Sequence, residues 1–133
     1  MNGFSITKRP DGILVYHFEN LSAEAHDEWA EKIKAIKIQY SENGWHLRQI
    51  YEFRADLLPD PYGTQKSIAV GSFQPENLVN STVVVVPNLH FRFAMNHTMP
   101  RMSDSSFIHL VDAFDEGIAW LNERHELFKK GQL

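Results

Sequence analysis

Histidine and methionine are the side chains of this sequence that point most directly to metal chemistry. The chain has seven histidines, and two of them, His90 and His97, stand seven positions apart with Met95, Met99 and Met102 nearby. If this segment is helical, the two histidines lie close to one face, where imidazole and thioether groups would suit copper. The simpler interpretation is that these side chains fill and border a helix packing face, since methionine is a common gap-filler. Because the histidines are scattered over the whole chain, we predict no metal site and no cofactor.

Two aspartates differ from the other carboxylates, most of which are expected on solvated helix surfaces. Asp56 and Asp60 follow the carboxyl end of a predicted strand, within an irregular segment. In open α/β sheets, ligands tend to bind at that end of the strands. Aspartate beside proline is also ordinary turn chemistry, so both interpretations stay open.

The usual catalytic signatures are absent from the sequence. The chain has no cysteine, no glycine-rich phosphate loop and no serine in a G-x-S-x-G turn. Thiol nucleophiles, disulfides and thiolate metal sites are therefore excluded, and no phosphate-loop or esterase motif remains. We predict no catalytic residue and favour a non-enzymatic role over a minor enzymatic activity.

Composition and charge narrow the class of protein further. The 133 residues, 43% of them apolar and 23% charged, suit one globular domain over residues 1–133. Thirteen Lys and Arg against seventeen Asp and Glu give a net charge of −4. This charge argues against nucleic-acid binding, although residues 89–93 interleave aromatic and basic side chains. No apolar run approaches the roughly 20 residues of a membrane span, and the start lacks a signal-peptide pattern, so we expect a cytoplasmic protein.

Five segments have the pattern of β-strands. Residues 4–8 alternate apolar and polar side chains, and residues 13–18 form a nearly continuous apolar run after a turn at 9–12, which predicts a β-hairpin. The second of these strands is expected to lie inside the sheet, because it is apolar on both faces. Three further strands are predicted at residues 46–53, 81–86 and 107–111.

Two segments have clear helical periodicity. The first carries Ala25, Trp29, Ile33, Ile36 and Tyr40 on one face, with Asn20 or Ser22 as its cap and Asn43-Gly44 as its end. We expect Trp29 and Ile33 to pack on the sheet. The last helix is predicted to begin at a capping Asp112 and to bury Phe114, Ile118, Leu121, His125 and Phe128.

The intervening segments are harder to assign. Two prolines and a glycine predict irregular structure over residues 55–63, followed by a short helix capped by Thr64 and running to about Ser72. Pro75 is a candidate first residue for another helix. Residues 89–98 fit either a helix capped by Asn88 or a strand, because their apolar residues also alternate. The overall order, β-β-α-β-α-β-α-β-α, predicts an α/β fold with a mostly parallel sheet and right-handed crossovers.

This order of elements, together with the ending at residues 107–112 and the segment Glu116-Gly117-Ile118-Ala119-Trp120-Leu121, resembles the SpoIIAA-like branch of the STAS family. The resemblance implies a β-α superhelix with an added N-terminal strand, in a bacterial, cytoplasmic regulatory protein. Members of the family bind protein partners, and several are switched by serine phosphorylation in an Asp-Ser-Ser-Gly segment after the third strand. The matching stretch here begins at Asp60 and continues through Gly63 and Thr64, and both serines of the motif are missing.

Two functions follow as hypotheses. The first is a non-enzymatic regulatory domain that binds a protein partner, with a homodimer as one candidate, through the loop residues Asp60, Tyr62, Gly63, Thr64 and Ser67. Tyr62 is its expected anchor, because an amphipathic ring among stiff prolines is suited to an interface. The alternative is a binding protein or minor enzyme for an apolar or anionic small molecule, using the segments 55–64 and 87–100. A cavity under residues 87–100 would favour the small molecule, and an exposed apolar patch beside Tyr62 would favour the protein partner.

Overall fold

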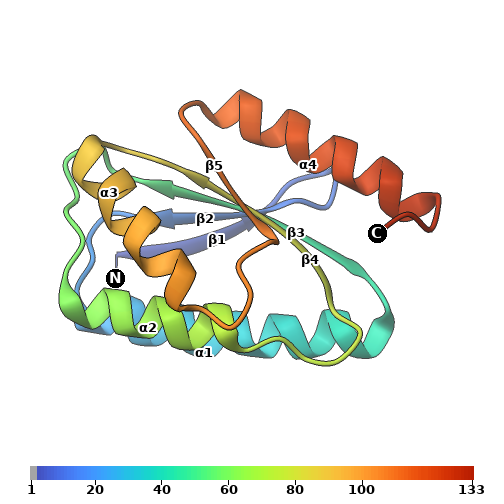
Figure 1. The fold of residues 1–133 in the computed structure, drawn as a ribbon, viewed down its shortest axis with the longest axis horizontal. Coiled ribbons are helices and arrows are strands. Elements are labelled where there is room, and N and C mark those ends of the chain that lie inside the picture. Colours follow the sequence, from blue (N-terminus) through green and yellow to red (C-terminus); the bar gives the residue numbers. More distant parts are fainter. Residues whose placement is uncertain (1–2) are drawn as a thin grey trace.

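The computed structural model describes residues 3–133 as an α/β fold around a five-stranded mixed sheet (Figure 1). The strands lie side by side in the order in which they occur along the chain. Strands β1 and β2 pair in antiparallel fashion, and every later pair is parallel. The strands are β1 (Phe4–Lys8), β2 (Leu14–Phe18), β3 (His46–Phe53), β4 (Val79–Val85) and β5 (Ile108–Val111).

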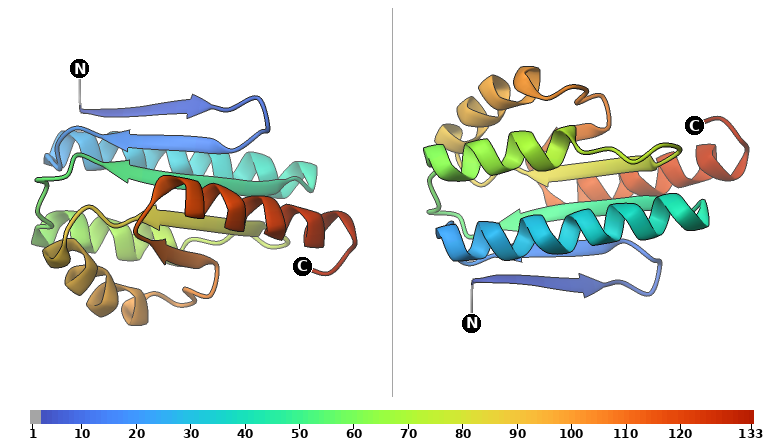
Figure 2. Two further views of the ribbon diagram at one scale, coloured as in Figure 1. Left: turned by 90° about the horizontal axis from the view of Figure 1, so that it is seen from above. Right: turned by 90° about the horizontal axis from the view of Figure 1, so that it is seen from below.

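Helices cover both faces of the sheet. Figure 2 shows α1, α2 and α3 side by side on one face and α4 alone on the other. The helices are α1 (Ala23–Asn43), α2 (Pro61–Ser72), α3 (Leu89–Thr98) and α4 (Phe114–Lys129), with a short 3₁₀ turn (Met99–Arg101) after α3. Within residues 3–133, no helix combines the length and the apolar character needed to cross a bilayer.

The predicted hairpin, the predicted parallel sheet and the first helix are confirmed. Ser22 caps α1 by accepting a hydrogen bond from the Ala25 N–H at 3.1 Å, and Gly44 ends the helix in the left-handed conformation. Residues 89–98, which the sequence left open between helix and strand, form a helix whose cap is Asn88.

Three local predictions are wrong, and each has a local cause. The second helix begins at Pro61, because Asp60 rather than Thr64 accepts the capping hydrogen bond, at 2.7 Å from the Gly63 N–H. Residues 61–63 are therefore helical, with proline in the first turn, where its missing N–H costs nothing. The last helix has no side-chain cap, since the Asp112 carboxylate pairs with Arg92 instead. No helix follows Pro75, where the chain forms a turn into β4.

The core lies in two layers, one on each face of the sheet. Trp29 and Ile33 of α1 lie in the layer under α1, α2 and α3, as predicted, together with Tyr16 and Val84 of the sheet. The smaller layer under α4 contains Ile13, Ile50, Val83, Val111 and Leu121.

Helix α4 approaches the sheet closely at Gly117. A Cβ atom at this position would lie 2.7 Å from Val83 Cγ1 and 2.8 Å from Ile50 Cδ1. Only glycine leaves room for the helix backbone to pack this close to the strands.

Candidate ligand-binding site

A cavity of about 100 Å³ lies between the sheet and the helices α1, α2 and α3. Its lining residues extend from Asp60, which caps α2, to Gly71 in the last turn of that helix. The lining therefore extends over most of the length of α2, which is about 18 Å for 12 residues. This length is large for a cavity of about 100 Å³. It is therefore a narrow slot that follows α2.

Most of the cavity wall is apolar. Helix α3 and the segment after it contribute one side, strands β2 to β4 contribute the floor, and α2 contributes the other side. Apolar lining side chains include Phe18, Phe53, Val84, Phe91, Met95 and Met102. The Phe53 and Phe91 rings pack at a tilt with their centroids 4.4 Å apart, so β3 and α3 are in direct contact at the edge of the slot.

The floor of the cavity also carries a line of hydrogen-bonded polar groups. Tyr16 donates to Gln49 Oε1 at 2.6 Å, and the Gln49 amide donates to Thr82 Oγ1 at 2.8 Å. Thr82 in turn donates to Asn80 Oδ1 at 2.8 Å. Gln49 and Thr82 line the slot directly. In the described part of the chain, the Asn80 Nδ2 amide is buried without a hydrogen-bond partner.

Two buried aromatic residues next to this row of polar groups are joined by a hydrogen bond. The Trp29 indole N–H donates to the Tyr51 hydroxyl at 2.9 Å, and both rings line the cavity. Burial raises the pKa of Tyr51 well above its ordinary range, and it does the same for Tyr16, so both phenols remain protonated.

The most unusual group at the site is Lys37 of α1. Its side chain is only 1% exposed, and its ammonium donates to the backbone carbonyls of Val70 at 2.7 Å and Phe73 at 2.9 Å. The Phe107 ring centroid lies 5.7 Å from Nζ. Burial lowers the pKa of Lys37 to about 8. No carboxylate in residues 3–133 forms an ion pair with it.

The residues predicted as an interaction loop lie instead at the start of α2. Four of the five line the cavity, namely Asp60, Gly63, Thr64 and Ser67. Gly63 lies where α2 meets α1, and a Cβ there would be 2.5 Å from His26 Nε2. This glycine therefore serves the packing of the two helices.

Tyr62 does not line the cavity. It is 40% exposed, its hydroxyl donates to the carboxylate of Asp27 on α1, and Lys66 lies over its ring at 5.7 Å. Asp27 also pairs with Lys66, so the three side chains join the outer surfaces of α1 and α2. The hydrogen bonds from Tyr62 and Lys66 lower the pKa of Asp27.

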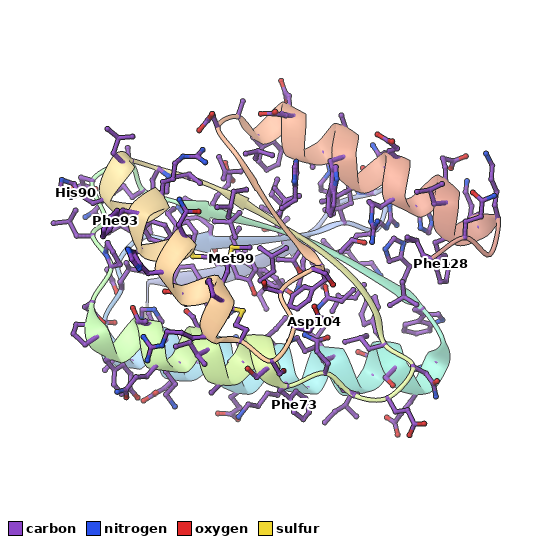
Figure 3. The ribbon with its side chains drawn as sticks, viewed as in Figure 1. Phe73, His90, Phe93, Met99, Asp104 and Phe128 are labelled. Carbon is purple, nitrogen blue, oxygen red and sulfur yellow. The ribbon has the colours of Figure 1, made fainter. Side chains whose placement is uncertain are left out.

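The other predicted candidates are separate from the cavity. Asp56 is exposed and pairs with Arg54 at 2.6 Å. His90 and His97 are exposed on α3, where the His97 ring packs at a tilt against Phe93. Figure 3 labels His90 and Phe93 along this helix. Among residues 3–133, no three metal-binding side chains come together.

A second polar cluster lies on the opposite face of the sheet, under α4. His46 of β3 and His125 of α4 face each other, and His46 Nε2 lies 2.8 Å from the Ser81 hydroxyl. Burial and the neighbouring positive charges lower the pKa of His46 to about 3. The cluster is packed against Phe128 and leaves no cavity of its own among those described, so we treat it as structural.

Two polar groups of the cavity, Lys37 and Gln49, are not among the residues predicted from the sequence. Lys37 lies four residues after Ile33, on the buried face of α1, and this spacing was the available signal. Gln49 lies two residues after Leu47 and two residues before Tyr51 along β3. Side chains two residues apart in a strand point to the same face, so the Gln49 amide lies on the face of those core side chains.

Comparison of the chain with models of protein families, with curated proteins and with solved structures finds no match. The site is therefore interpreted from its own geometry.

Proposed function

We propose that this protein binds a small, largely apolar molecule in the slot between α2, α3 and the sheet. The observation that carries the proposal is the position of the cavity, because Phe91, Ala94, Met95 and Thr98 of α3 all line it. A cavity under residues 87–100 is the feature expected to favour a small-molecule ligand over a protein partner.

The size and lining of the slot support a small ligand. Its volume of about 100 Å³ is somewhat below that of an engineered apolar cavity of about 150 Å³ that accepts benzene. The apolar wall would provide the binding free energy, and the few polar groups of the floor would fix orientation. The proposal is for binding, and no reaction is proposed for the slot.

Titration with neutral probes tests the proposal. 1-Butanol and 1-hexanol should each cause saturable changes in the amide resonances of Val84, Phe91 and Met95, as followed by NMR. Ala94→Leu fills part of the slot and should abolish these changes. Ala69→Leu makes the same substitution at an exposed position of α2 and should preserve them. If neither probe binds in a saturable way, the proposal is contradicted.

A regulatory role through a protein partner is the second candidate. The arrangement of hairpin, successive β-α units and a final helix supports the resemblance to SpoIIAA-like STAS proteins. The observation in its favour is the outer side of α3, where Leu89 is 81% and Phe93 67% exposed. Exposed apolar side chains of this size are typical of interaction sites.

If the partner is a second copy of this protein, measuring self-association tests this second candidate. Phe93→Ser removes an exposed ring on α3 that does not line the main cavity, so the fold and the ligand affinity should be preserved. Sedimentation equilibrium should then show weaker self-association than in the unsubstituted protein. A protein that is monomeric at all concentrations would exclude the homodimer.

A further inference from the structure

Lys37 is the only lysine or arginine that lines the slot within the described chain. Its ammonium has three N–H groups, and two are occupied by the backbone carbonyls of Val70 and Phe73. Among the ion pairs of residues 3–133, none joins a carboxylate to Lys37. A buried charge without a counter-charge is costly, so an anion placed here would be favoured.

The rest of the slot determines how such an anion would lie. Lys37 contacts the last turn of α2 and the residue after it, whereas the carboxylate of Asp60 lies at the first turn. The two ends of the slot therefore differ in charge. A ligand carboxylate would be attracted to the Lys37 end and repelled from the Asp60 end.

The shape of the slot narrows the class of ligand. A volume of about 100 Å³ is about two thirds of that of a cavity that accepts the six carbons of benzene, so it encloses on the order of four heavy atoms. The rest of a longer chain would extend toward the partly exposed Pro59 and Asp60. Because the lining residues extend along all of α2, a slender chain fits better than a broad ring system. The middle of the slot, with Phe91, Met95 and Val84, offers apolar contacts to that chain.

We propose that the ligand is a short-chain monocarboxylic acid whose carboxylate pairs with Lys37. Its hydrocarbon chain lies under α3 and points toward Asp60. This inference rests on the proposed function and adds the chemical class of the ligand. Binding gives Lys37 its missing third hydrogen bond and its counter-charge, and a charge-assisted hydrogen bond is roughly twice as strong as a neutral one.

A matched pair of ligands tests the inference on the unsubstituted protein. Hexanoate and 1-hexanol have similar chains and differ in the charge of the head group. Calorimetric titration at pH 7 should give hexanoate at least about tenfold higher affinity, equivalent to about 1.4 kcal/mol. Hexanoate that binds no more tightly than 1-hexanol overturns the carboxylate inference and leaves the proposed function standing. Failure of hexanoate, 1-hexanol and 1-butanol together overturns the proposed function.

Variants of Lys37 test whether this residue causes the higher affinity for hexanoate than for 1-hexanol. Lys37→Gln keeps N–H donors but removes the charge, so the preference for hexanoate should fall to less than about twofold while 1-hexanol binds as before. Lys37→Arg keeps the charge and should retain part of the preference. Lys34→Gln makes the same change at an exposed position of α1 and should keep all of it. If a Lys37 variant does not fold, the two-ligand comparison on the unsubstituted protein still decides the question. A preference for hexanoate that survives in a folded Lys37→Gln variant overturns the assignment to Lys37.

Discussion

The Nδ1 atoms of His46 and His125 lie 3.0 Å apart, and this contact joins β3 to α4. Only one proton fits between two nitrogens at this distance, so the pair is stable when at least one ring is neutral. Arg48 and Arg124 add positive charge nearby, and together with burial they hold the pKa of His46 at about 3. The packing of α4 on the sheet therefore depends on keeping at least one of the two rings neutral, and His46 is the ring whose lowered pKa keeps it so.

This pair makes the stability of the protein dependent on pH. The ordinary pKa of His46 is 6.5, and folding lowers it to about 3. As the pH falls below 6.5, His46 becomes protonated in the unfolded chain but stays neutral in the folded chain. Protonation therefore favours the unfolded state, and the free energy of unfolding decreases. Urea unfolding between pH 7.5 and 5 should show this decrease, and His46→Gln should reduce it. His90→Gln on the exposed side of α3 is the control, and an equal pH slope in all three proteins would contradict the prediction.

Ile33 should contribute strongly to stability. It is 1% exposed within the core layer under α1. Ile33→Ala should lower the free energy of unfolding by about 2–5 kcal/mol, because it removes buried methyl groups and leaves a void. Ile38 on the same helix is 44% exposed, so Ile38→Ala should cost within about 0.5 kcal/mol. Denaturant unfolding compares the two, and similar losses would show that α1 is packed differently.

Gly117 should tolerate no side chain. Gly117→Ala improves helix propensity by about 1 kcal/mol, but overpacking against Val83 and Ile50 costs about 1–3 kcal/mol. The net result should be a less stable protein with α4 displaced from the sheet. At Gly71, a Cβ would meet only the side chain of Met102, which is flexible. Thermal unfolding should therefore show a smaller loss for Gly71→Ala, and a Gly117→Ala variant of increased stability would contradict the close approach.

Tyr62 should be dispensable for ligand binding. Its hydroxyl bonds to Asp27 on the outer surface of α1, and its ring does not line the slot. Tyr62→Ala should therefore leave the affinity for 1-hexanol unchanged in the titration. Tyr62→Phe, which keeps the ring and removes only the hydroxyl, is the control. If Tyr62→Ala abolishes 1-hexanol binding, the interaction of α1 with α2 must itself shape the cavity.

The sequence could predict those elements whose apolar residues follow a regular period. Trp29, Ile33 and Tyr40 mark the buried face of α1, and the apolar run at Val83 and Val84 marks β4, so both were assigned correctly. The start of α2 was misplaced because Asp60 and Thr64 are both good capping residues. Only the hydrogen bond of Asp60 to Gly63 distinguishes them.

The candidate site was harder to predict than the fold. Four of its predicted residues line the cavity, because the carboxyl ends of parallel strands meet at one edge of the sheet. Tyr62 was predicted to be an interface anchor in a loop, but α2 already begins at Pro61, so Tyr62 is a helical residue. The direction of its side chain is therefore set by the start of the helix, which the sequence misplaced. Lys37 could not be identified, since its charge suggested a solvated surface while its partners, Val70 and Phe73, lie more than thirty residues away.

The sequential order of the strands has a consequence for how the chain folds. Each strand pairs with the one synthesised just before it, so every closed loop is short and its entropy cost is modest. Such a chain can add one β-α unit after another as it leaves the ribosome, without waiting for distant partners. Helix α4 is the exception, because it covers β3, β4 and β5 from the other side and is made last. Until α4 docks, the side chains of Ile50, Val83 and Val111 lack their helical cover, and exposed apolar surface of this kind makes a folding chain prone to aggregate.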